Sequence, residues 1–551
     1  MVEHEDGWRI FARAPITRRR FIAGSAALSA AVSALAIVGC DDDDASEAES
    51  GGTLRHGTSL PIAFGLDPHV EQATGLAIFP KVYGYLLHVD PRDDTTIYDH
   101  AGAVEQPDEL TYILRLRPDV RFQQVAPVNG RAVEAEDVVQ SILRFRSSPL
   151  VVNRTWHETI LDTVSATDTQ TVNVRLHRPS VYTLHELGGI ASGAIIPREA
   201  IEQGLSIAAA GAGSGPFQID RVDLDRQVRL VRNETYYGER AHVDAMEWTI
   251  YADDDAKVRA FEKREVDVIP NRNQAEARRL ADVSRDIEVS AERSLAYLSL
   301  GLRVDKPPFG DERIRRAIDL LIDRDELIRE LASGEGEILG PVNPWLGDGF
   351  WALPREEVGA ASGASLSLED RIAEAKQLLR AANDGGFGFK IQVRDSPDLV
   401  DAASLVRDQL ARGEVYAVLE PLREIEWFLN FRTGRFDATL ISQLPYESPD
   451  IPTRLYHSKG IDGSGSTFGF SDPAIDWLVE RSWGEADREL RRGTLLDAQR
   501  RMLEARPMLQ LFTGTGYAAA WTYVRNQPTG LAGSLRRYYY HQWLDDDAPT
   551  R

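Results

Sequence analysis

Two short stretches of the chain carry residue types that an active or metal site would need. His157 and Glu158 resemble the start of a zinc-protease helix, but no second histidine follows at the required spacing. Asp253, Asp254 and Asp255 lack the spaced ligands and the glycine of a calcium loop, so we expect a solvated turn there. No Gly-x-Ser-x-Gly elbow occurs. The sequence thus predicts no catalytic residue, no metal site and no cofactor, with an exported hydrolase kept as an alternative.

Composition narrows the class of protein. The 551 residues include 86 acidic and 63 basic side chains, for a formal charge of −23. Such a surface repels phosphate backbones, which argues against nucleic-acid binding, although the charge also simply aids solubility. The length requires two or three structural domains. Cys40 is the single cysteine, so an intrachain disulfide and a thiolate-cluster metal site are excluded.

The first forty residues have the pattern of an export signal. Five arginines lie among residues 9–20, and residues 21–39 carry no charge. This order predicts a signal peptide over residues 1–39, the alternative being a transmembrane helix. Residues 17–22 resemble a twin-arginine motif, and residues 37–40 resemble a bacterial lipobox whose lipidated residue is Cys40. Residues 40–52 then predict a lipid-anchored acidic tether, which places the protein outside the cytoplasm on a membrane.

Short alternating strands and longer amphipathic helices predict an α/β protein. No repeat of fixed period is found. The strands are expected at residues 111–116, 171–176 and 227–232, and the helices at residues 135–144, 312–331, 368–382, 402–412 and 488–504.

From Gly51 onward, blocks in a fixed order resemble the family 5 extracellular solute-binding proteins, which are dipeptide, oligopeptide and nickel receptors of ABC importers. These blocks comprise Gly52 to Arg55, Leu66 to His69, Val82 to Leu86, Leu110 to Tyr112 with Leu116 to Phe122, Glu136 to Val138, Gly213 to Phe217, Val266 to Val268, Pro308-Phe309 with Arg313 to Ile318, Asp323-Arg324, and Phe470 to Asp476.

The resemblance implies a bilobal, three-domain, type II periplasmic-binding fold that closes like a clam shell. It implies a discontinuous core of lobe I at residues 53–82, 209–288 and 515–551. It implies a flanking domain of lobe I at residues 83–208 and lobe II at residues 289–514. A monomer is expected, which captures a small molecule or peptide and delivers it to ABC permease subunits. A ligand-sensing lipoprotein of the same fold is the alternative.

The segment 442–450 resembles the stretch in which peptide-binding members carry an aspartate that pairs with the peptide amino group. Pro445 stands at that position here, so this anchor is absent. Gln443, Tyr446 and Glu447 remain candidate ligand-binding residues, against the alternative of an ordinary loop. The ligand stays open between a peptide, a capped or cyclic peptide, a sugar, an opine-like compound and a metal chelate.

Other candidates are polar or aromatic residues expected near a cleft between lobes. Each also has a plain structural interpretation, as part of an aromatic core, a surface ion pair or a structural loop. These further ligand-binding candidates are Trp156, His157, Tyr297, Arg394, Asp395, Trp427, Phe470 and His69.

Overall fold

The computed structural model describes most of the chain after the expected tether. The described residues are 50–59, 66–70, 75–90, 93–147, 155–203, 212–271, 274–294, 296–382, 386–443, 448–460, 466–527 and 540–550. Residues 48–551 form one compact unit, separate from residues 1–47. The expected signal peptide, Cys40 and most of the tether therefore lie outside the described residues. No helix in the described part of the chain is both long and apolar enough to cross a bilayer.

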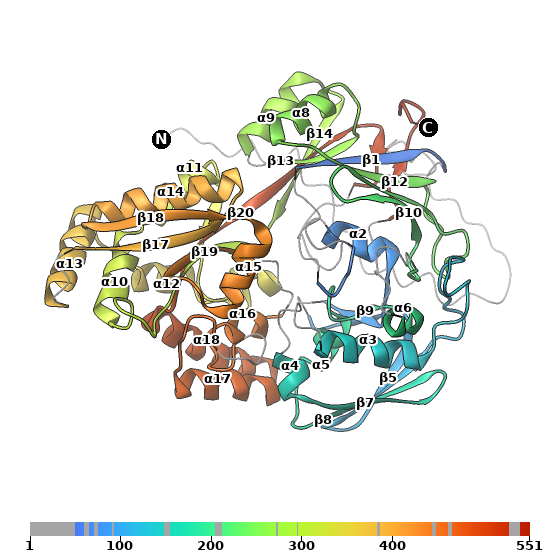
Figure 1. Cartoon of the computed structure of the whole chain (residues 1–551), viewed down its shortest axis with the longest axis horizontal. Coiled ribbons are helices and arrows are strands. Elements are labelled where there is room, and N and C mark those ends of the chain that lie inside the picture. The colour runs from blue at the N-terminus through green and yellow to red at the C-terminus, as the bar shows by residue number, and fades with distance from the viewer. Residues whose placement is uncertain are drawn as a thin grey trace, which may run out of the picture. The chain divides into compact units, whose positions relative to one another are not determined.

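One half of a large mixed sheet forms the core of the first lobe (Figure 1). Strands β1 and β12 run parallel, and β10, β11 and β12 form an antiparallel meander beside them. Apolar residues such as Leu54, Phe217 and Met246 fill the core of this lobe. The elements are β1 (Thr53–Thr58), α2 (Gly75–Val82), β10 (Phe217–Asp223), β11 (Gln227–Arg232), β12 (Ala245–Ile250), α8 (Asp254–Glu262), β13 (Val268–Asn271), α9 (Gln274–Val283), β14 (Ile287–Arg293), β21 (Val524–Arg525) and β22 (Trp543–Leu544).

A flanking region between α2 and β10 contains a four-stranded antiparallel sheet in the order β5-β6-β8-β7. Helix α3 packs against this sheet. The elements are β2 (Gly84–Tyr85), β3 (Leu87–Val89), β4 (Thr96–Tyr98), β5 (Ala101–Asp108), β6 (Thr111–Leu116), α3 (Ala135–Ser147), α4 (Thr155–Thr159), β7 (Leu161–Asp168), β8 (Thr171–Leu176), α5 (Thr183–Gly188), β9 (Ala194–Ile195) and α6 (Arg198–Glu202).

The second lobe has strands in the order β15-β19-β17-β18, with helices around them. Its remaining short strand, β16, pairs with β20. The elements are β15 (Tyr297–Leu302), α10 (Glu312–Leu321), α11 (Arg324–Leu331), β16 (Gly336–Ile338), η2 (Leu346–Gly349), α12 (Arg355–Ala361), α13 (Leu368–Ala381), β17 (Phe387–Arg394), α14 (Pro397–Ala411), β18 (Val415–Leu422), α15 (Glu424–Thr433), β19 (Ala438–Gln443), α16 (Asp450–Arg454), α17 (Pro473–Gly484) and α18 (Arg488–Ala505).

The long strand β20 (Met508–Trp521) belongs to both lobes. Residues near its start pair with β15, and residues near its end pair with β13 and β14. It crosses the molecule as one continuous red arrow (Figure 1). The expected division at residues 514 and 515 falls inside this strand, so the two lobes share a backbone-paired connection.

The Gly-Ser-Gly-Pro turn has a direct steric reason. A Cβ atom on Gly213 would lie 1.8 Å from the carbonyl oxygen of Val82, and one on Gly215 would lie 2.5 Å from that of Lys81. The backbone here packs against the end of α2, where the Gly215 N–H donates to the Val82 carbonyl at 2.9 Å. Only glycine permits this approach, which joins the core of lobe I to the flanking region.

The three predicted strands are confirmed as β6, β8 and β11, with the expected bounds. The single predicted helix over residues 312–331 is wrong, because the chain forms α10 and α11 with a break between them. Ile322 is extended, and the Asp323 side chain accepts a hydrogen bond from the Glu326 N–H as the N-cap of α11. Asp323, in the middle of an apolar pattern, therefore marks the beginning of a new helix.

The expected turn at the aspartate run is also wrong. Asp253 is the N-cap of α8, and its side chain accepts a hydrogen bond from the Ala256 N–H at 2.7 Å. Asp254 and Asp255 occupy the first helical turn, where carboxylates favour the positive end of the helix dipole. The run begins a helix.

Candidate functional site

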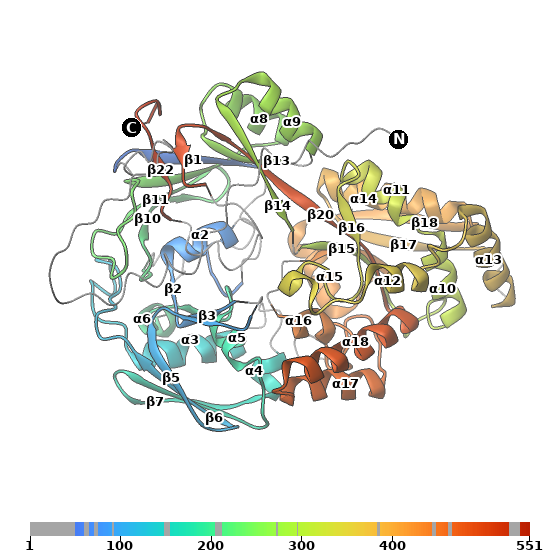
Figure 2. The same cartoon turned by 180° about the vertical axis from the view of Figure 1, so that it is seen from behind.

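The flanking region contacts the second lobe around α16 and α17. The Thr155 hydroxyl donates to the Gly460 carbonyl at 2.6 Å, and the Val181 N–H donates to the Trp483 carbonyl at 2.8 Å. Helices α4 and α5 lie next to α16 and α17 in both Figure 1 and Figure 2. Apolar side chains from both sides belong to one packed cluster. The two lobes therefore meet a second time, through side chains and loops in addition to the strand they share.

Buried charges lie at this second contact. The Arg454 guanidinium is 2.8 Å from a carboxylate oxygen of Glu186, and it also binds Asp450 one helical turn away. Glu186 belongs to α5 of the flanking region, whereas Asp450 and Arg454 belong to α16. The three side chains are at most 3% exposed. One guanidinium thus serves two carboxylates inside the protein.

Local sequence positions each member of this group. Asp450 and Arg454 are four residues apart and so face the same side of α16. The Ser448 hydroxyl donates to Asp450 and orients its carboxylate. Glu186 lies in the short helix α5, whose first residue, Thr183, donates through its hydroxyl to the Ser180 carbonyl at 2.8 Å. The interlobe contact then brings α5 and α16 together.

The surroundings of these charges are apolar. Burial raises the pKa of Glu186 to about 7, because it outweighs the attraction of Arg454, while Asp450 raises this pKa further. Burial, followed by the charge of Arg454, lowers the pKa of His157 to about 3. Neither ring nitrogen of His157 has a hydrogen-bond partner among the described residues, and its Nε2 lies 3.8 Å from Glu186. His157 is therefore a neutral neighbour of Glu186 at physiological pH.

A second set of charges crosses the same contact nearer to solvent. The Arg491 guanidinium of α18 donates to Asp94 at 2.9 Å, and Arg178 donates to Glu480 at 3.0 Å. Arg178 and Glu480 are each about one-third exposed. Exposed pairs of this kind contribute little to stability, so the buried group around Arg454 is the distinctive feature of this contact.

Two of the sequence candidates lie in the flanking region beside this group. Trp156 and His157 are both buried in α4, and the Trp156 indole donates to the Ser180 hydroxyl at 3.3 Å. The His157 ring contacts Phe145 at 4.7 Å between centroids. His69 is fully buried, with its ring between the Ala194 carbonyl and Arg144. The structure places His157 next to Glu186 and gives His69 structural contacts.

The candidates around segment 442–450 are only partly described. Tyr446 and Glu447 lie outside the described residues. Gln443 ends β19, where its backbone is the register partner of Tyr297 on β15. Tyr297 is 4% exposed. The structure thus brings Tyr297 and Gln443 to adjacent strands of the second lobe.

The remaining candidates lie elsewhere in the second lobe. The Arg394 guanidinium lies 5.3 Å from the centroid of the Trp427 ring and binds Glu424 at 3.3 Å. Asp395 is exposed, and its backbone N–H donates to the Leu422 carbonyl. Trp427 stacks on Phe431 with centroids 5.3 Å apart, and its indole donates to Thr439. Phe470 is buried in the large apolar cluster. The structure joins Arg394 with Trp427 but does not join them with His157.

Sequence reasoning missed Glu186 and Arg454. Their pairing joins segments that no local pattern connects. The spacing of Asp450 and Arg454 was the available signal, since a four-residue interval in a helix favours an ion pair. A candidate helix of five residues was too short for periodicity to reveal it.

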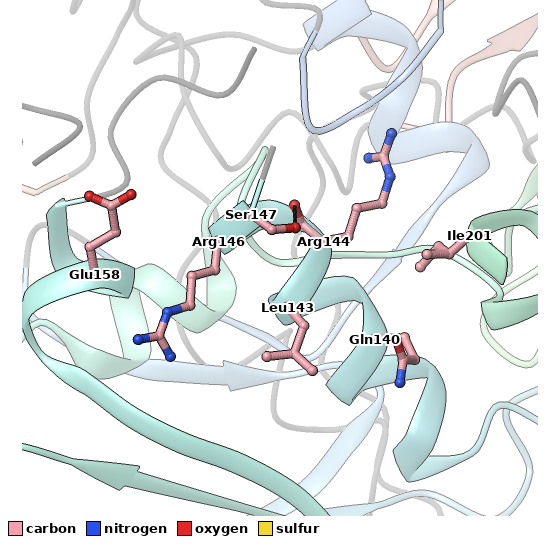
Figure 3. Close-up of a pocket in the computed structure, with 7 residues that line it drawn as sticks. All are labelled: Gln140, Leu143, Arg144, Arg146, Ser147, Glu158 and Ile201. Atoms are coloured by element: carbon pink, nitrogen blue, oxygen red, sulfur yellow. Dashed lines mark hydrogen bonds between the residues drawn. The ribbon is translucent and has the colours of Figure 1, made fainter. Parts of the chain in front are cut away.

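A hollow of about 560 Å³ lies beside α3, α4 and α6 of the flanking region (Figure 3). Arg144 points away from Arg146 and Glu158 in this view, because its guanidinium binds Asp67 and His69. The hollow is open to solvent, and its described lining residues all belong to the flanking region, so no ligand is assigned to it. Its lining residues are Gln140, Leu143, Arg144, Arg146, Ser147, Glu158 and Ile201.

Residues 100–465 match the family described as bacterial extracellular solute-binding proteins, family 5. This match covers more than half of the chain, so the protein belongs to that family. The expected family is thereby confirmed, and its members bind solutes outside the cytoplasm.

Relatives and solved structures agree with this assignment. The chain is 24% identical to a probable di/tripeptide-binding protein of Pseudomonas aeruginosa over 75% of this chain and 80% of the relative. It is 20% identical to the oligopeptide-binding protein AppA of Bacillus subtilis, over 84% of each chain.

Among solved structures, the periplasmic binding protein DppA of Helicobacter pylori in complex with the peptide STSA superposes with a TM-score of 0.76. That comparison has 20% identity and covers 90% of this chain and 98% of the other. MoaA from A. tumefaciens R10, in complex with mannopinic acid, also has a TM-score of 0.76, at 22% identity over 90% of this chain and 100% of the other. The expected bilobal α/β fold class is confirmed.

Proposed function

We propose that this solute-binding protein is the receptor of an ABC importer, which captures a peptide or peptide-like compound between its lobes and delivers it to a permease. The observation that carries the proposal is the double connection of the lobes. They share β20 and meet again around Arg454. A hinge and a separate closing contact are what a ligand-gated trap needs. Binding energy then shifts the population from open to closed, without covalent chemistry.

The relatives support a peptide or an opine-like ligand. Several relatives are named for di- and oligopeptides. Two other binding proteins of similar structure, MoaA and AgaA, were solved in complex with mannopinic acid and agropinic acid, respectively. Pro445 stands where peptide-binding members are expected to carry the aspartate for the amino group. A proline cannot pair with an ammonium. A cargo that is not held by a free N-terminus therefore fits this chain best.

The proposed localisation of the protein rests on its first forty residues. The twin-arginine and lipobox patterns support export followed by lipidation of Cys40. Residues 48–551 form a separate compact unit, which fits a domain on a tether. We also assign the lobe I core to residues 53–82, 209–288 and 515–551, the flanking domain to 83–208 and lobe II to 289–514. Replacing Cys40 with alanine is expected to move the protein from the membrane to the soluble fraction with an unchanged circular dichroism spectrum.

Native mass spectrometry tests the trap directly. We expect the purified protein to retain one compound per chain, released unchanged in mass on denaturation. Free and N-acetylated forms of one dipeptide form a matched pair of added probes, and they should bind with similar affinity because no aspartate occupies position 445. A strong preference for the free amine would contradict the cargo proposal. Release of a chemically altered compound would favour the hydrolase alternative.

A further inference from the structure

The buried charges at the second interlobe contact do not balance. Arg454 supplies one positive charge, whereas Glu186 and Asp450 supply two negative charges when both are ionised. The side chains are 1%, 3% and 0% exposed, respectively. A carboxylate without a counter-charge is costly in such surroundings. The closed arrangement therefore favours a state with one fewer negative charge.

Among the described residues, no basic side chain other than Arg454 and the neutral His157 lies within 4 Å of the Glu186 or Asp450 carboxylate. His157 of α4 and His185 of α5 have pKa values lowered, chiefly by burial, so they add no positive charge near neutral pH. Asp94, from the turn between β3 and β4, lies 2.9 Å from Arg491 and 3.6 Å from Arg488, both of α18, so these two arginines are directed at Asp94. Tyr182 precedes α5 and stays neutral, because burial raises the pKa of its hydroxyl.

The group also spans the moving parts of the proposed trap. Arg454 and Asp450 belong to α16 in the second lobe, and Glu186 belongs to α5 in the flanking region of the first. Separation of the lobes would break the 2.8 Å contact between Arg454 and Glu186 and would hydrate both groups. The cost of burying the extra charge is therefore incurred only on closure.

We propose that Arg454 is the positioning residue that clasps the two lobes, and that closure takes up one proton onto the carboxylate pair Glu186 and Asp450. The inference rests on the lobe closure proposed above. Glu186 is the expected proton acceptor, since burial and Asp450 raise its pKa to about 7 in the closed form.

The direction of the pH effect follows from this uptake. An exposed glutamate in the open form has a pKa near 4.3. Between that value and about 7, the closed form binds more protons than the open form. Closure is then favoured in acid, and the ratio of closed to open forms falls by up to about tenfold per pH unit across this window. Above pH 7 the ratio levels off.

Energy transfer between two dyes across the contact tests the proposal without any ligand. The full chain carrying Cys40→Ser has no other cysteine, so Ser165→Cys and Ala486→Cys provide specific labelling sites. Both positions are exposed, one in the flanking region and one in the second lobe. We expect transfer efficiency to fall as pH rises from 5 to 8.5. Glu186→Gln removes the titrating group and should hold the lobes closed throughout that range.

Glu480→Gln is the matched control, because it changes the pair with Arg178, about one-third exposed, at the same contact. It should retain the pH dependence of the parent. Arg454→Lys should restore part of the closure lost in Arg454→Gln, as a positive charge remains. Asp450→Asn provides a second test of the carboxylate pair and should also weaken the pH dependence.

A parent protein whose transfer efficiency is constant over this pH range would overturn the proposal. An unchanged pH profile in the Glu186→Gln variant would also overturn the proposal. If Glu186→Gln does not fold, an unchanged profile in Asp450→Asn would have the same meaning. Since no ligand is added, this failure would leave the receptor function and its cargo untouched. Failure of the mass-spectrometry test would contradict the receptor function and leave the pH profile standing.

Discussion

The two connections between the lobes are built on different physical principles. At β20, the lobes share one strand, which pairs through its backbone with β15 of the second lobe and with β13 of the first, where Trp521 at its end stacks on Phe261. At α5 and α16, they share side-chain charges, chiefly the pair of Arg454 and Glu186. Backbone pairing persists through a bending motion, whereas a desolvated ion pair is either made or broken. The connection through β20 is therefore permanent, whereas the connection between α5 and α16 is suited to opening.

The largest expected effect concerns the permanent connection. Trp521→Ala removes a side chain that is 4% exposed and whose indole donates to the Phe261 carbonyl. We expect the free energy of unfolding to fall by about 3–5 kcal/mol, measured by urea denaturation. Trp477→Ala is the control, because Trp477 is 57% exposed and its loss should change stability by less than about 0.5 kcal/mol. Equal effects of the two substitutions would contradict the role given to β20.

The next effect concerns the contact suited to opening. Arg454→Met leaves Glu186 and Asp450 buried without a counter-charge, a loss of about 3 kcal/mol or more. Because the pair crosses the lobes, the loss should appear as opening, with a larger radius of gyration in small-angle X-ray scattering. A variant as compact as the parent would show that the lobes are held together elsewhere.

A third effect sharpens the electrostatic side of the comparison. His157 is buried, its ring has no hydrogen-bond partner in the described part of the chain, and its pKa is lowered to about 3. The unfolded chain therefore binds a proton below pH 6.5 that the folded chain resists, so His157 costs stability as pH falls. His157→Phe should exceed the parent in stability by about 2 kcal/mol at pH 5, and this gain should fade above pH 6.5. Thermal unfolding at both pH values measures the difference, and a gain independent of pH would contradict this explanation.

The smallest effect belongs to the exposed pair at the same contact. Arg178→Met removes a charge that is about one-third exposed and that binds Glu480 at 3.0 Å. We expect a change in stability below about 1 kcal/mol, reduced further by salt. Urea denaturation at low and high salt measures it. A loss as large as that of Arg454→Met would show that burial does not distinguish the two pairs.

Local patterns predicted much of the fold. Alternation of apolar residues placed β6, β8 and β11 correctly, since one face of a strand packs on the core. The same reasoning failed at Asp323, because apolar periodicity continued across a helix cap. The order of short motifs predicted the family, and the close approach of Gly213 to Val82 gives a steric reason for one of them.

The candidate site was predicted less well. His157 was singled out for its chemistry, and it does lie beside Glu186, but its ring is buried and neutral and packs on Phe145. Arg394 and Trp427 contact one another within the second lobe. A side chain's type indicates what chemistry it offers, whereas its partners depend on packing across the molecule.

Residues that are neighbours along the chain were enough to predict the family and the α/β class, and they carry the pattern ahead of Cys40 from which export is predicted. Only the tertiary structure decided that β20 serves both lobes and that Arg454 meets Glu186. Those contacts arise when distant segments pack together and exclude water. Their energies depend on burial, which no local pattern of residues specifies.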